Sequence, residues 1–320
     1  MAVHLVTGAA GFLGSYLVRA LLEQDKGVRA FDRVDPGSRL PGVEWVTGDV
    51  RDAAALRRAC EGCDVVFHLA ALKPQGRINL ESMRAVNLGG TGNVLEAARA
   101  AGVRRVVYLS SVEIFGAPKV APCPEWWPPA PLGEWGRLKI AAETLCCQAV
   151  DKGLEVTILR PMTIVGPGLA EPFLLNILAS IRASQPVKLL GNGENHFQVV
   201  HAEDVAEACL VAAKHSAAVG EAFNIGSADV PQVRKMVEEI IQRVGSTSTI
   251  RSIPVPIARL AVALLHPFGK APVEPEILAI GAIDYVFDIS LAKQKLGWQP
   301  HWGNVDALMD TYKSIAAMRP

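Results

Sequence analysis

The chain has 320 residues, half of them hydrophobic, and its 32 basic side chains balance 32 acidic ones. This size and composition allow one large domain, or one and a half, with a core that needs no disulfide or metal. The scattered charges leave no basic footprint for nucleic acid, so no nucleic-acid partner is expected.

The first element is predicted to be a buried strand, Val3–Thr7, because its residues are apolar and largely β-branched. An amphipathic helix is expected from Phe12 to Gln24. Between them lie three glycines with a spacing of three. Gly8 allows a tight turn, Gly11 lets the backbone approach a pyrophosphate, and Gly14 lets the helix pack closely on the strand. This pattern is typical of a dinucleotide-binding sheet.

The start of that helix is predicted to bind the phosphates. Free amide groups there, at Phe12 and Leu13, would face them with the positive end of the helix dipole behind. A second strand, 28–31, ends at Asp32, whose carboxylate is placed to hold the adenosine ribose hydroxyls. Asp32 favours NAD because it repels a 2′-phosphate, whereas Arg33 would accommodate NADP.

Strands and helices then alternate. Strands are expected at 43–47, 64–69 and 104–109, and one long helix at 80–101, weakened at Gly89-Gly90, where close packing or a kink is expected. The repeated β-α-β pattern predicts an α/β fold with a doubly wound parallel sheet. The remaining residues expected to line the cofactor are Asp49, Val50, Leu69, Ala70, Ala71, Asn87, Ser110, Pro161 and Thr163.

The stretch 117–131 contains six prolines and two tryptophans, a density that excludes a helix or a central strand. A loop of this length is usually functional, so we expect a wall or lid; the alternative is a rigid surface loop with its tryptophans tucked down.

The second half changes rhythm after residue 166. Helices are predicted at 133–150, 172–183 and 202–215, and strands at 155–159, 187–190, 197–201 and 221–225, with a mostly helical lobe from about 230 to 285. The Rossmann domain is therefore predicted to comprise 1–165 and about 200–228, and the substrate lobe about 166–199 and 229–320.

The cysteines and the most apolar stretch of the sequence, 253–265, indicate the cellular compartment in which the protein is expected. Six cysteines, of which only Cys60 and Cys63 have metal-like spacing, fit a reducing, cytoplasmic setting better than a zinc site. The strand at Val3 leaves no room for a signal peptide. Residues 253–265 are too short to span a bilayer and include Arg259, which favours a core or interface helix over loose membrane contact.

Eight segments in the expected order resemble the extended short-chain dehydrogenases/reductases, a superfamily that includes nucleotide-sugar epimerases and hydroxysteroid dehydrogenases. The resemblance implies that Ser111 hydrogen-bonds the reacting oxygen. It also implies that Lys139 contacts the nicotinamide ribose and lowers the pKa of a tyrosine four residues earlier. The segments are TGAAGFLG (7–14), GDV (48–50), HLAA (68–71), SSVEIFG (110–116), WGRLK (135–139), RPMTIVGPG (160–168), VHAEDVA (200–206) and FDISLAKQKLGWQP (287–300).

The chain departs from this superfamily at the tyrosine, which is Trp135. An indole is no general acid or base near neutral pH, and losing a positioned proton donor typically costs about 10²–10⁴ in rate. No other tyrosine has the required spacing to a lysine. Glu113 is a possible substitute acid, on the same side as Ser111 if the chain stays extended. Weaker candidates, each with a purely structural alternative, are Glu125, Glu134, His196 and His201.

A second departure concerns the substrate. Phe197 occupies the position of an arginine that, in this superfamily, commonly binds the diphosphate of nucleotide sugars. The sequence around it is more similar to the 3β-hydroxysteroid dehydrogenase-like branch. A phenyl ring offers apolar surface instead of a bidentate phosphate partner. The expected substrate is a steroid-, terpenoid- or polyketide-like alcohol or ketone. Its expected contacts are Lys73, Val112, Trp126, Trp127, Trp135 and Phe197.

Three functions stay open on these residues. The first is an NAD(P)-dependent oxidoreductase, the second an NAD-retaining epimerase, dehydratase or decarboxylase acting on a sugar-like substrate, and the third an NAD-binding protein without redox turnover. The resemblance also implies a homodimer that pairs the helices at 80–101 and 133–150.

Overall fold

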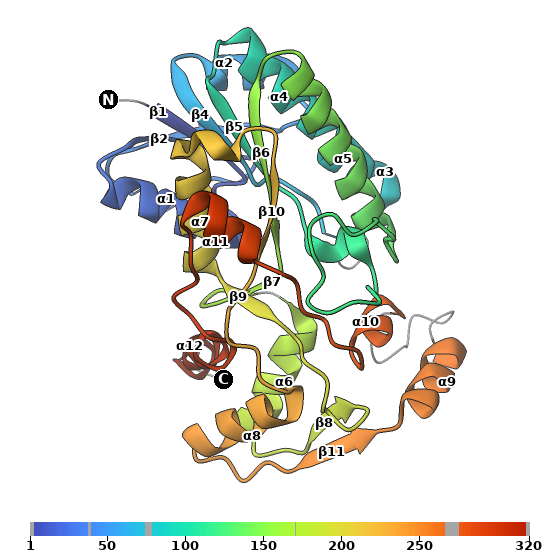
Figure 1. The fold of residues 1–320 in the computed structure, drawn as a ribbon. Helices are drawn as coiled ribbons and strands as arrows, with labels where there is room; N and C mark the ends of the chain where they lie inside the picture. The colour runs from blue at the N-terminus through green and yellow to red at the C-terminus, as the bar shows by residue number, and fades with distance from the viewer. Residues whose placement is uncertain (1–2, 38–39, 74–78, 170, 266–274, 318–320) are drawn as a thin grey trace.

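The computed structural model describes residues 3–37, 40–73, 79–169, 171–265 and 275–317. Its centre is a seven-stranded sheet of parallel strands in the order β10-β6-β5-β4-β1-β2-β3 (Figure 1). The order reverses between β1 and β4, which confirms the predicted doubly wound sheet and places the ligand crevice at that point. The strands are β1 (Val3–Thr7), β2 (Gly27–Asp32), β3 (Val43–Thr47), β4 (Cys63–His68), β5 (Arg105–Leu109), β6 (Glu155–Pro161) and β10 (Ala222–Ile225).

Helices cover both faces of this sheet. On one face α1 and α7 pack against each other, and on the other α2 packs on α4, which packs on α5. The apolar stripe of α1 shows why it forms here, since Leu13, Leu17 and Leu21 recur on one face and are buried. Helix α2 was not predicted from the sequence. These helices are α1 (Phe12–Glu23), α2 (Ala53–Cys60), α4 (Thr91–Ala100), α5 (Glu134–Asp151) and α7 (Ala202–Lys214).

The long helix predicted at 80–101 is divided into three pieces. Helix α3 (Leu80–Arg84) runs into a π-helical segment, Ala85–Gly90, which continues as α4. A Cβ on Gly90 would lie 2.5 Å from the side chain of Val50, so only glycine fits between this segment and the sheet edge. The close packing expected at Gly89-Gly90 is confirmed.

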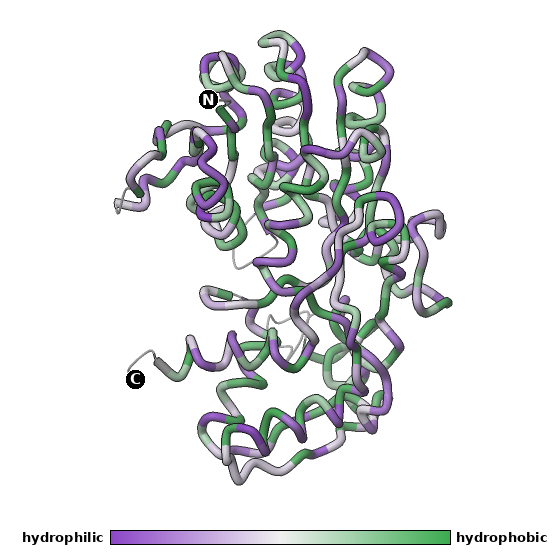
Figure 2. Tube along the Cα trace, turned by 60° about the vertical axis from the view of Figure 1, so that its left-hand side comes forward, coloured by the Kyte–Doolittle hydropathy of each residue, from purple (hydrophilic) through white to green (hydrophobic). Residues whose placement is uncertain are grey.

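Most of the rest of the chain lies below the sheet in Figure 1, whereas α11 packs on β10 beside the sheet. Strands β8 and β11 with helices α6, α8, α9 and α10 are called the C-terminal lobe here. Strands β7 and β9 pair beneath the sheet, and Figure 2 shows hydrophobic and hydrophilic positions alternating along the helix that ends the chain, α12. The bounds are β7 (Thr163–Val165), α6 (Pro172–Arg182), β8 (Val187–Leu190), β9 (Val199–His201), α8 (Val233–Arg243), β11 (Ile250–Ile253), α9 (Val255–Leu265), α10 (Pro275–Ile280), α11 (Ser290–Leu296) and α12 (Asn304–Ala317).

Two predictions for this half need correction. The strand expected at 197–201 begins only at Val199, and Phe197 makes a single bridge with Tyr285 instead. The apolar stretch 253–265, expected to be a core or interface helix, forms a helix that is not in the core, and an interface role stays a prediction. In α9, Val262 is buried, whereas Ile257, Leu260 and Leu264 are 61%, 62% and 62% exposed. The predicted division into a Rossmann domain and a substrate lobe stays a prediction.

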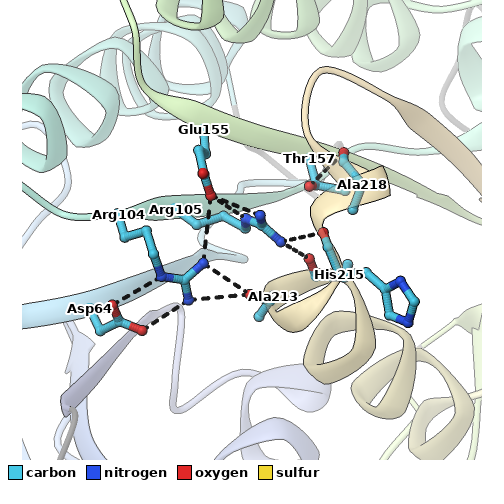
Figure 3. Close-up of polar contacts among 9 residues, drawn as sticks. Asp64, Arg104, Arg105, Glu155, Thr157, Ala213, His215 and Ala218 are labelled. Carbon is cyan, nitrogen blue, oxygen red and sulfur yellow. Dashed lines mark hydrogen bonds and ion pairs between the residues drawn. The ribbon is translucent and has the colours of Figure 1, made fainter.

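A polar network fastens the amino ends of the central strands, at the sheet edge opposite the crevice (Figure 3). Arg105, which begins β5, is buried and donates to the carbonyls of Ala212 and His215 at 2.7 and 2.6 Å, where α7 ends. Its guanidinium also pairs with Glu155 at 2.8 Å. Buried arginine needs such partners, and the helix carboxyl end favours a cation. This cluster has a structural role, because it joins β5 and β6 to the end of α7 and lies at the opposite end of the strands from the expected ligand site.

His68 ends β4 and is enclosed in the core. Its Nδ1 lies 2.7 Å from the hydroxyl of Thr7 and its Nε2 lies 3.0 Å from the hydroxyl of Thr91. Burial, helped by the positive charge of Lys139, lowers the pKa of His68 to about 3. The imidazole is therefore neutral in the folded protein at any ordinary pH.

This histidine predicts a loss of stability in acid. Between the ordinary pKa of 6.5 and the folded pKa of about 3, only the unfolded chain binds the proton. The stabilisation is complete above 6.5 and is lost as the pH falls, by about 1.4 kcal/mol per pH unit from this group. Urea unfolding between about pH 7 and about pH 4 measures it. The variant His68→Gln keeps hydrogen-bonding atoms without the titration, and an equally steep decline in that variant would contradict the assignment.

Candidate active site

The glycine turn lies at the carboxyl end of β1, in the crevice. Gly8 has φ +74°, and a Cβ there would lie 2.8 Å from the backbone of Ala70. A Cβ on Gly14 would lie 2.1 Å from the carbonyl oxygen of Gly8. The tight turn and the close helix packing expected for these glycines are confirmed, because any side chain would separate α1 from the sheet.

The helix start fits the phosphates of a dinucleotide. Gly11 is the exposed N-cap of α1, and no side chain caps the helix there. Amide groups at the N-terminus of a helix are a ready anion site. The Asp32 carboxylate accepts from the amides of Ala10 at 3.0 Å and Val34 at 3.1 Å, so it sets the shape of the turn from the end of β2. The residues present therefore fit a dinucleotide at this position.

Other predicted cofactor residues have partners in the protein. Asp49 pairs with Arg51 at 2.6 Å and lies 4.0 Å from Arg33. The Asn87 side chain clamps the backbone of Leu72, the residue that follows Ala71, through bonds of 2.7 and 2.9 Å. Asn87 thus fixes the loop after β4 that borders the crevice. Also at the crevice edge of the sheet are Val50, Leu69, Ala70, Ser110, Pro161 and Thr163.

Ser111 follows β5 and begins a 3₁₀ turn, Val112–Phe115. Its hydroxyl accepts from the amide of Glu113 at 3.1 Å, which leaves the hydroxyl hydrogen able to donate to a ligand. The chain is not extended here, so the expectation that Glu113 shares a side with Ser111 by strand alternation is wrong. The serine cap favours the turn because it satisfies an amide that a helix start leaves free.

Lys139 and Trp135 lie one turn apart on α5. Lys139 is 4% exposed, and its Nζ donates to the carbonyl of Leu109 at 2.6 Å. The same nitrogen lies 4.9 Å from the ring centroids of both Tyr108 and Trp135. Burial lowers the pKa of Lys139 to about 8, although the carboxylate of Glu143 opposes the shift. Aromatic faces on two sides favour the ammonium form within this enclosed space.

The Trp135 indole fills space that a phenol would leave. It is buried in a small cluster with Met83 and Leu138, beside Leu72 of the loop after β4. Its ring N–H has no hydrogen-bond partner among the described residues. The indole thus packs and shields Lys139, and it supplies no group able to exchange a proton with a substrate.

Glu113 faces a group of charged side chains from both halves of the molecule. Its side chain keeps contact with solvent, yet the surrounding protein raises its pKa. The carboxylates of Glu171 and Glu276 add to that rise, whereas the ammonium groups of Lys73 and Lys139 oppose it. A glutamate beside a lysine and in a solvent-reached crevice has the chemistry of a proton carrier.

Packing holds this turn against α5. A Cβ on Gly136 would lie 2.6 Å from the carbonyl oxygen of Glu113, so the two elements touch at a glycine. A Cβ on Gly133 would lie 2.9 Å from the carboxylate of Glu276 in α10, and Lys73 pairs with Glu171 at 3.5 Å. The Glu113 turn, the start of α5 and the C-terminal lobe therefore meet at one site.

The weaker acid–base candidates have structural partners. Glu125 accepts from the amide of Asn224 at 3.1 Å, and Glu134 pairs with Arg84 at 3.4 Å. His196 contacts Asp284 at 2.8 Å. His201 is buried and stacks on Trp302 with ring centroids 4.2 Å apart. The structural alternatives stated for these four residues agree with their surroundings.

Sequence reasoning missed a buried ionic chain behind the site. The Ser110 hydroxyl donates to Glu143, which pairs with Arg160 at 2.7 Å. Arg160 also donates to the carbonyl of Glu125 in the proline-rich loop at 3.1 Å. The available signal was the spacing of Glu143, four residues after Lys139 and hence on the same helix face. This chain fixes the end of β5 against α5 and the loop.

The residues predicted to contact substrate differ in exposure. Phe197 is buried in a row of aromatic rings, stacked on Tyr285 at 5.7 Å and 6.4 Å from Phe173. Tyr285 contacts Phe287, which contacts Phe115 of the 3₁₀ turn, so the row ends beside Glu113. Of the remaining contacts, Val112 is buried, Trp127 is half-buried and Lys73 is exposed.

Trp126 does not line a closed pocket, because it is 76% exposed. Its ring contacts that of Trp127 at 6.1 Å, within the loop 117–131, which contains no helix among its residues, as predicted. A part for Trp126 in substrate binding stays a prediction.

Comparison with known proteins adds a family and several relatives. A model of the "NAD dependent epimerase/dehydratase family" matches residues 4–226. The 2-alkyl-3-oxoalkanoate reductase of Stenotrophomonas maltophilia is 32% identical over 98% of this chain and 99% of its own. The 3beta-hydroxysteroid-dehydrogenase/decarboxylase isoform 1 of Arabidopsis thaliana is 28% identical over 92% and 75%, respectively. The solved structure of MoeE5 in complex with UDP-glucose and NAD is 27% identical, with a TM-score of 0.76 and coverage of 99% of both chains.

Proposed function

Because this chain belongs to the NAD-dependent epimerase/dehydratase family, we propose that it is an oxidoreductase acting on an apolar alcohol or ketone of the steroid, terpenoid or polyketide kind. The observation that carries this proposal is the buried aromatic row from Phe173 through Phe197 to Phe115. These rings are packed in the core, so the interior around position 197 is apolar and no guanidinium is present there for a diphosphate. The names of two relatives, a 3-oxoalkanoate reductase and a hydroxysteroid dehydrogenase, support it.

NAD is the cofactor, and it supplies a carbon that accepts or donates hydride. The turn from Gly8 to Gly14 would hold its pyrophosphate, and Asp32 the adenosine ribose, with NADP as the less favoured alternative. Ser111 would donate to the reacting oxygen of the substrate. Lys139 would fix the cofactor ribose and keep a positive charge near that oxygen.

Glu113 is proposed as the group that moves the proton. Its carboxyl belongs to the 3₁₀ turn that Ser111 begins, and its pKa is raised because the surrounding protein weakens its hydration, although the side chain reaches solvent. In the oxidation direction the Glu113 carboxylate would take the proton from the hydroxyl oxygen of the substrate. The hydride would leave the carbon that bears this hydroxyl. Trp135 would exclude water from the Lys139 side of the site without taking part in proton transfer.

The alternative function is an epimerase, dehydratase or decarboxylase that retains NAD, favoured by the similarity to MoeE5 with UDP-glucose. A third, NAD binding without turnover, is favoured by Trp135 itself. Homodimer formation through α3, α4 and α5, and a cytoplasmic location in which the six free cysteines stay reduced, complete the proposal.

One assay separates these functions. Purified protein with NAD is given apolar secondary alcohols, including a hydroxysteroid and a 3-hydroxy fatty acid, and NADH is followed by absorbance at about 340 nm; turnover at ordinary enzyme rates of about 1–10³ per second is expected. UDP-glucose in parallel, analysed for a changed sugar without net NADH, tests the epimerase. No turnover with either set of substrates, while NAD is bound, would favour NAD binding without redox turnover and would overturn the proposal.

A further inference from the structure

Helix α9 carries an apolar face that the described residues leave uncovered. Ile257, Leu260 and Leu264 recur at intervals of three and four, so they lie on one side of the helix, and each is more than 60% exposed. On the opposite side Val262 is buried, and α9 contacts α10 there. Figure 1 shows α9 at the periphery of the C-terminal lobe, away from the sheet. Such contiguous exposed aliphatic surface marks an interaction site.

The chain segment that contains this face is basic, whereas the neighbouring helix α10 carries the acidic Glu276. No acidic residue occurs between Glu239 and Glu274, although acidic and basic residues are equal in number over the whole chain. Arg259 lies on α9 and is exposed, and Arg251 is exposed on β11, the strand that leads into α9. Lys188, exposed on β8, is the register partner of Arg251. One basic side chain thus lies on α9 itself, and two more lie on the two-stranded sheet that leads into it.

We propose that α9 docks on an anionic phospholipid bilayer, with Ile257, Leu260 and Leu264 among the acyl chains and Arg251, Arg259 and Lys188 at the headgroups. An amphipathic helix with basic flanks lies in the membrane interface in this way. No helix of the described chain is long and apolar enough to cross a bilayer, so the contact is with one leaflet.

A second copy of the chain fits this face less well. In a two-fold dimer the same patch meets itself, so Arg259 and its basic neighbours would face the same positive charges. Stable interfaces also bury about 800 Å² per partner, far more than three side chains of one short helix offer. An anionic bilayer is compatible with both the positive charge and the small apolar area of the α9 face.

Helix α9 is close in sequence to α10, which contacts the candidate active site. The next described helix, α10, carries Glu276, which lies against Gly133 at the start of α5 and whose charge helps to raise the pKa of Glu113. A membrane at α9 would therefore lie near the mouth of the candidate active site. Membrane docking does not depend on the proposed oxidoreductase function, and each is tested separately.

The test is co-sedimentation of the full-length protein with vesicles of phosphatidylcholine alone and with phosphatidylglycerol added. Binding to the anionic vesicles is expected, with weaker binding at high salt. The variant I257E/L260E should reduce the vesicle partition coefficient by at least about tenfold, since two exposed aliphatic side chains are lost from the apolar face. The variant Leu40→Glu is the matched control, because Leu40 is 37% exposed between β2 and β3, away from α9 and from the proposed dimer helices, and should leave binding unchanged.

Several outcomes would overturn the proposal. Wild-type protein that stays in solution with anionic vesicles contradicts it, as does equal binding by wild type and the double variant. A double variant that does not bind vesicles any differently but changes from dimer to monomer in sedimentation velocity would assign the face to a second copy. Activity toward a water-soluble alcohol should be equal in wild type and the double variant, which separates this test from that of the reaction.

Discussion

Replacing Glu113 with glutamine is expected to lower turnover by about 10²–10⁴-fold and to leave NAD affinity unchanged. The amide keeps the size and the solvent contact of the side chain but carries no exchangeable acid proton. Glu113 lies on the Ser111 turn, outside the glycine turn that would hold the cofactor, so binding and chemistry separate. Steady-state kinetics in the oxidation direction and NAD titration by tryptophan fluorescence measure the two effects.

The pH profile sharpens this result. Alcohol oxidation needs ionised Glu113, so activity should fall as the pH drops through a pKa raised above that of an ordinary glutamate. That acid limb should vanish in Glu113→Gln. Glu134→Gln is the matched control, because Glu134 begins α5 nearby but is paired with Arg84 and Arg137. Equal turnover in Glu113→Gln and wild type would remove Glu113 from the mechanism.

Replacing Trp135 with tyrosine in the Glu113→Gln protein is expected to restore turnover by about 10²-fold or more. The new phenol would lie one helical turn before Lys139, whose ammonium is 4.9 Å from the present indole ring. A buried cation so close lowers the pKa of a phenol and makes it a usable acid. Rescue is measured as kcat with the best alcohol from the substrate panel.

The double variant with Trp135→Phe controls for size. Phenylalanine opens the same space beside Met83 and Leu138 without a hydroxyl, so it should restore nothing. Equal rescue by phenylalanine would show that bulk, and not proton transfer, limits the reaction. No rescue by tyrosine, with NAD binding intact, would count against a dehydrogenase site at Lys139.

Features that depend on near neighbours were predictable from the sequence. The packing at Gly14 involves residues within one strand–helix unit, where steric exclusion of a Cβ leaves few arrangements, and the positive φ at Gly8 is a local property of the same turn. At Gly90 the glycine signalled the close approach, whereas its partner Val50 and the π-helical form of the segment were not predicted. The repeated β-α-β pattern then predicted the doubly wound parallel sheet, whereas the order of its strands was not predicted.

Features that depend on distant residues were not predictable. The pair of Glu143 and Arg160 joins a helix to a strand, and its burial follows only from the fold. The orientation of Glu113 depends on a turn capped by Ser111, and a strand-like reading of that segment was equally possible. The apolar composition of α9 indicated burial, but no other element of the described chain covers Leu260 or Leu264. The composition of a helix indicates whether its burial would be favourable, but only the fold determines whether another element covers it.

The route of the chain between the sheet and the lobe beneath it has a consequence for how the cleft opens. It leaves the sheet after β6, returns from β9 to α7, leaves again after β10, returns from α10 to α11 and leaves a last time for α12. With these five connections instead of one, the two parts have no single hinge about which to swing apart. Neither part is a continuous segment, so recombination cannot exchange the lobe as a cassette. New substrates in such an architecture are acquired by substitution within the lobe, residue by residue.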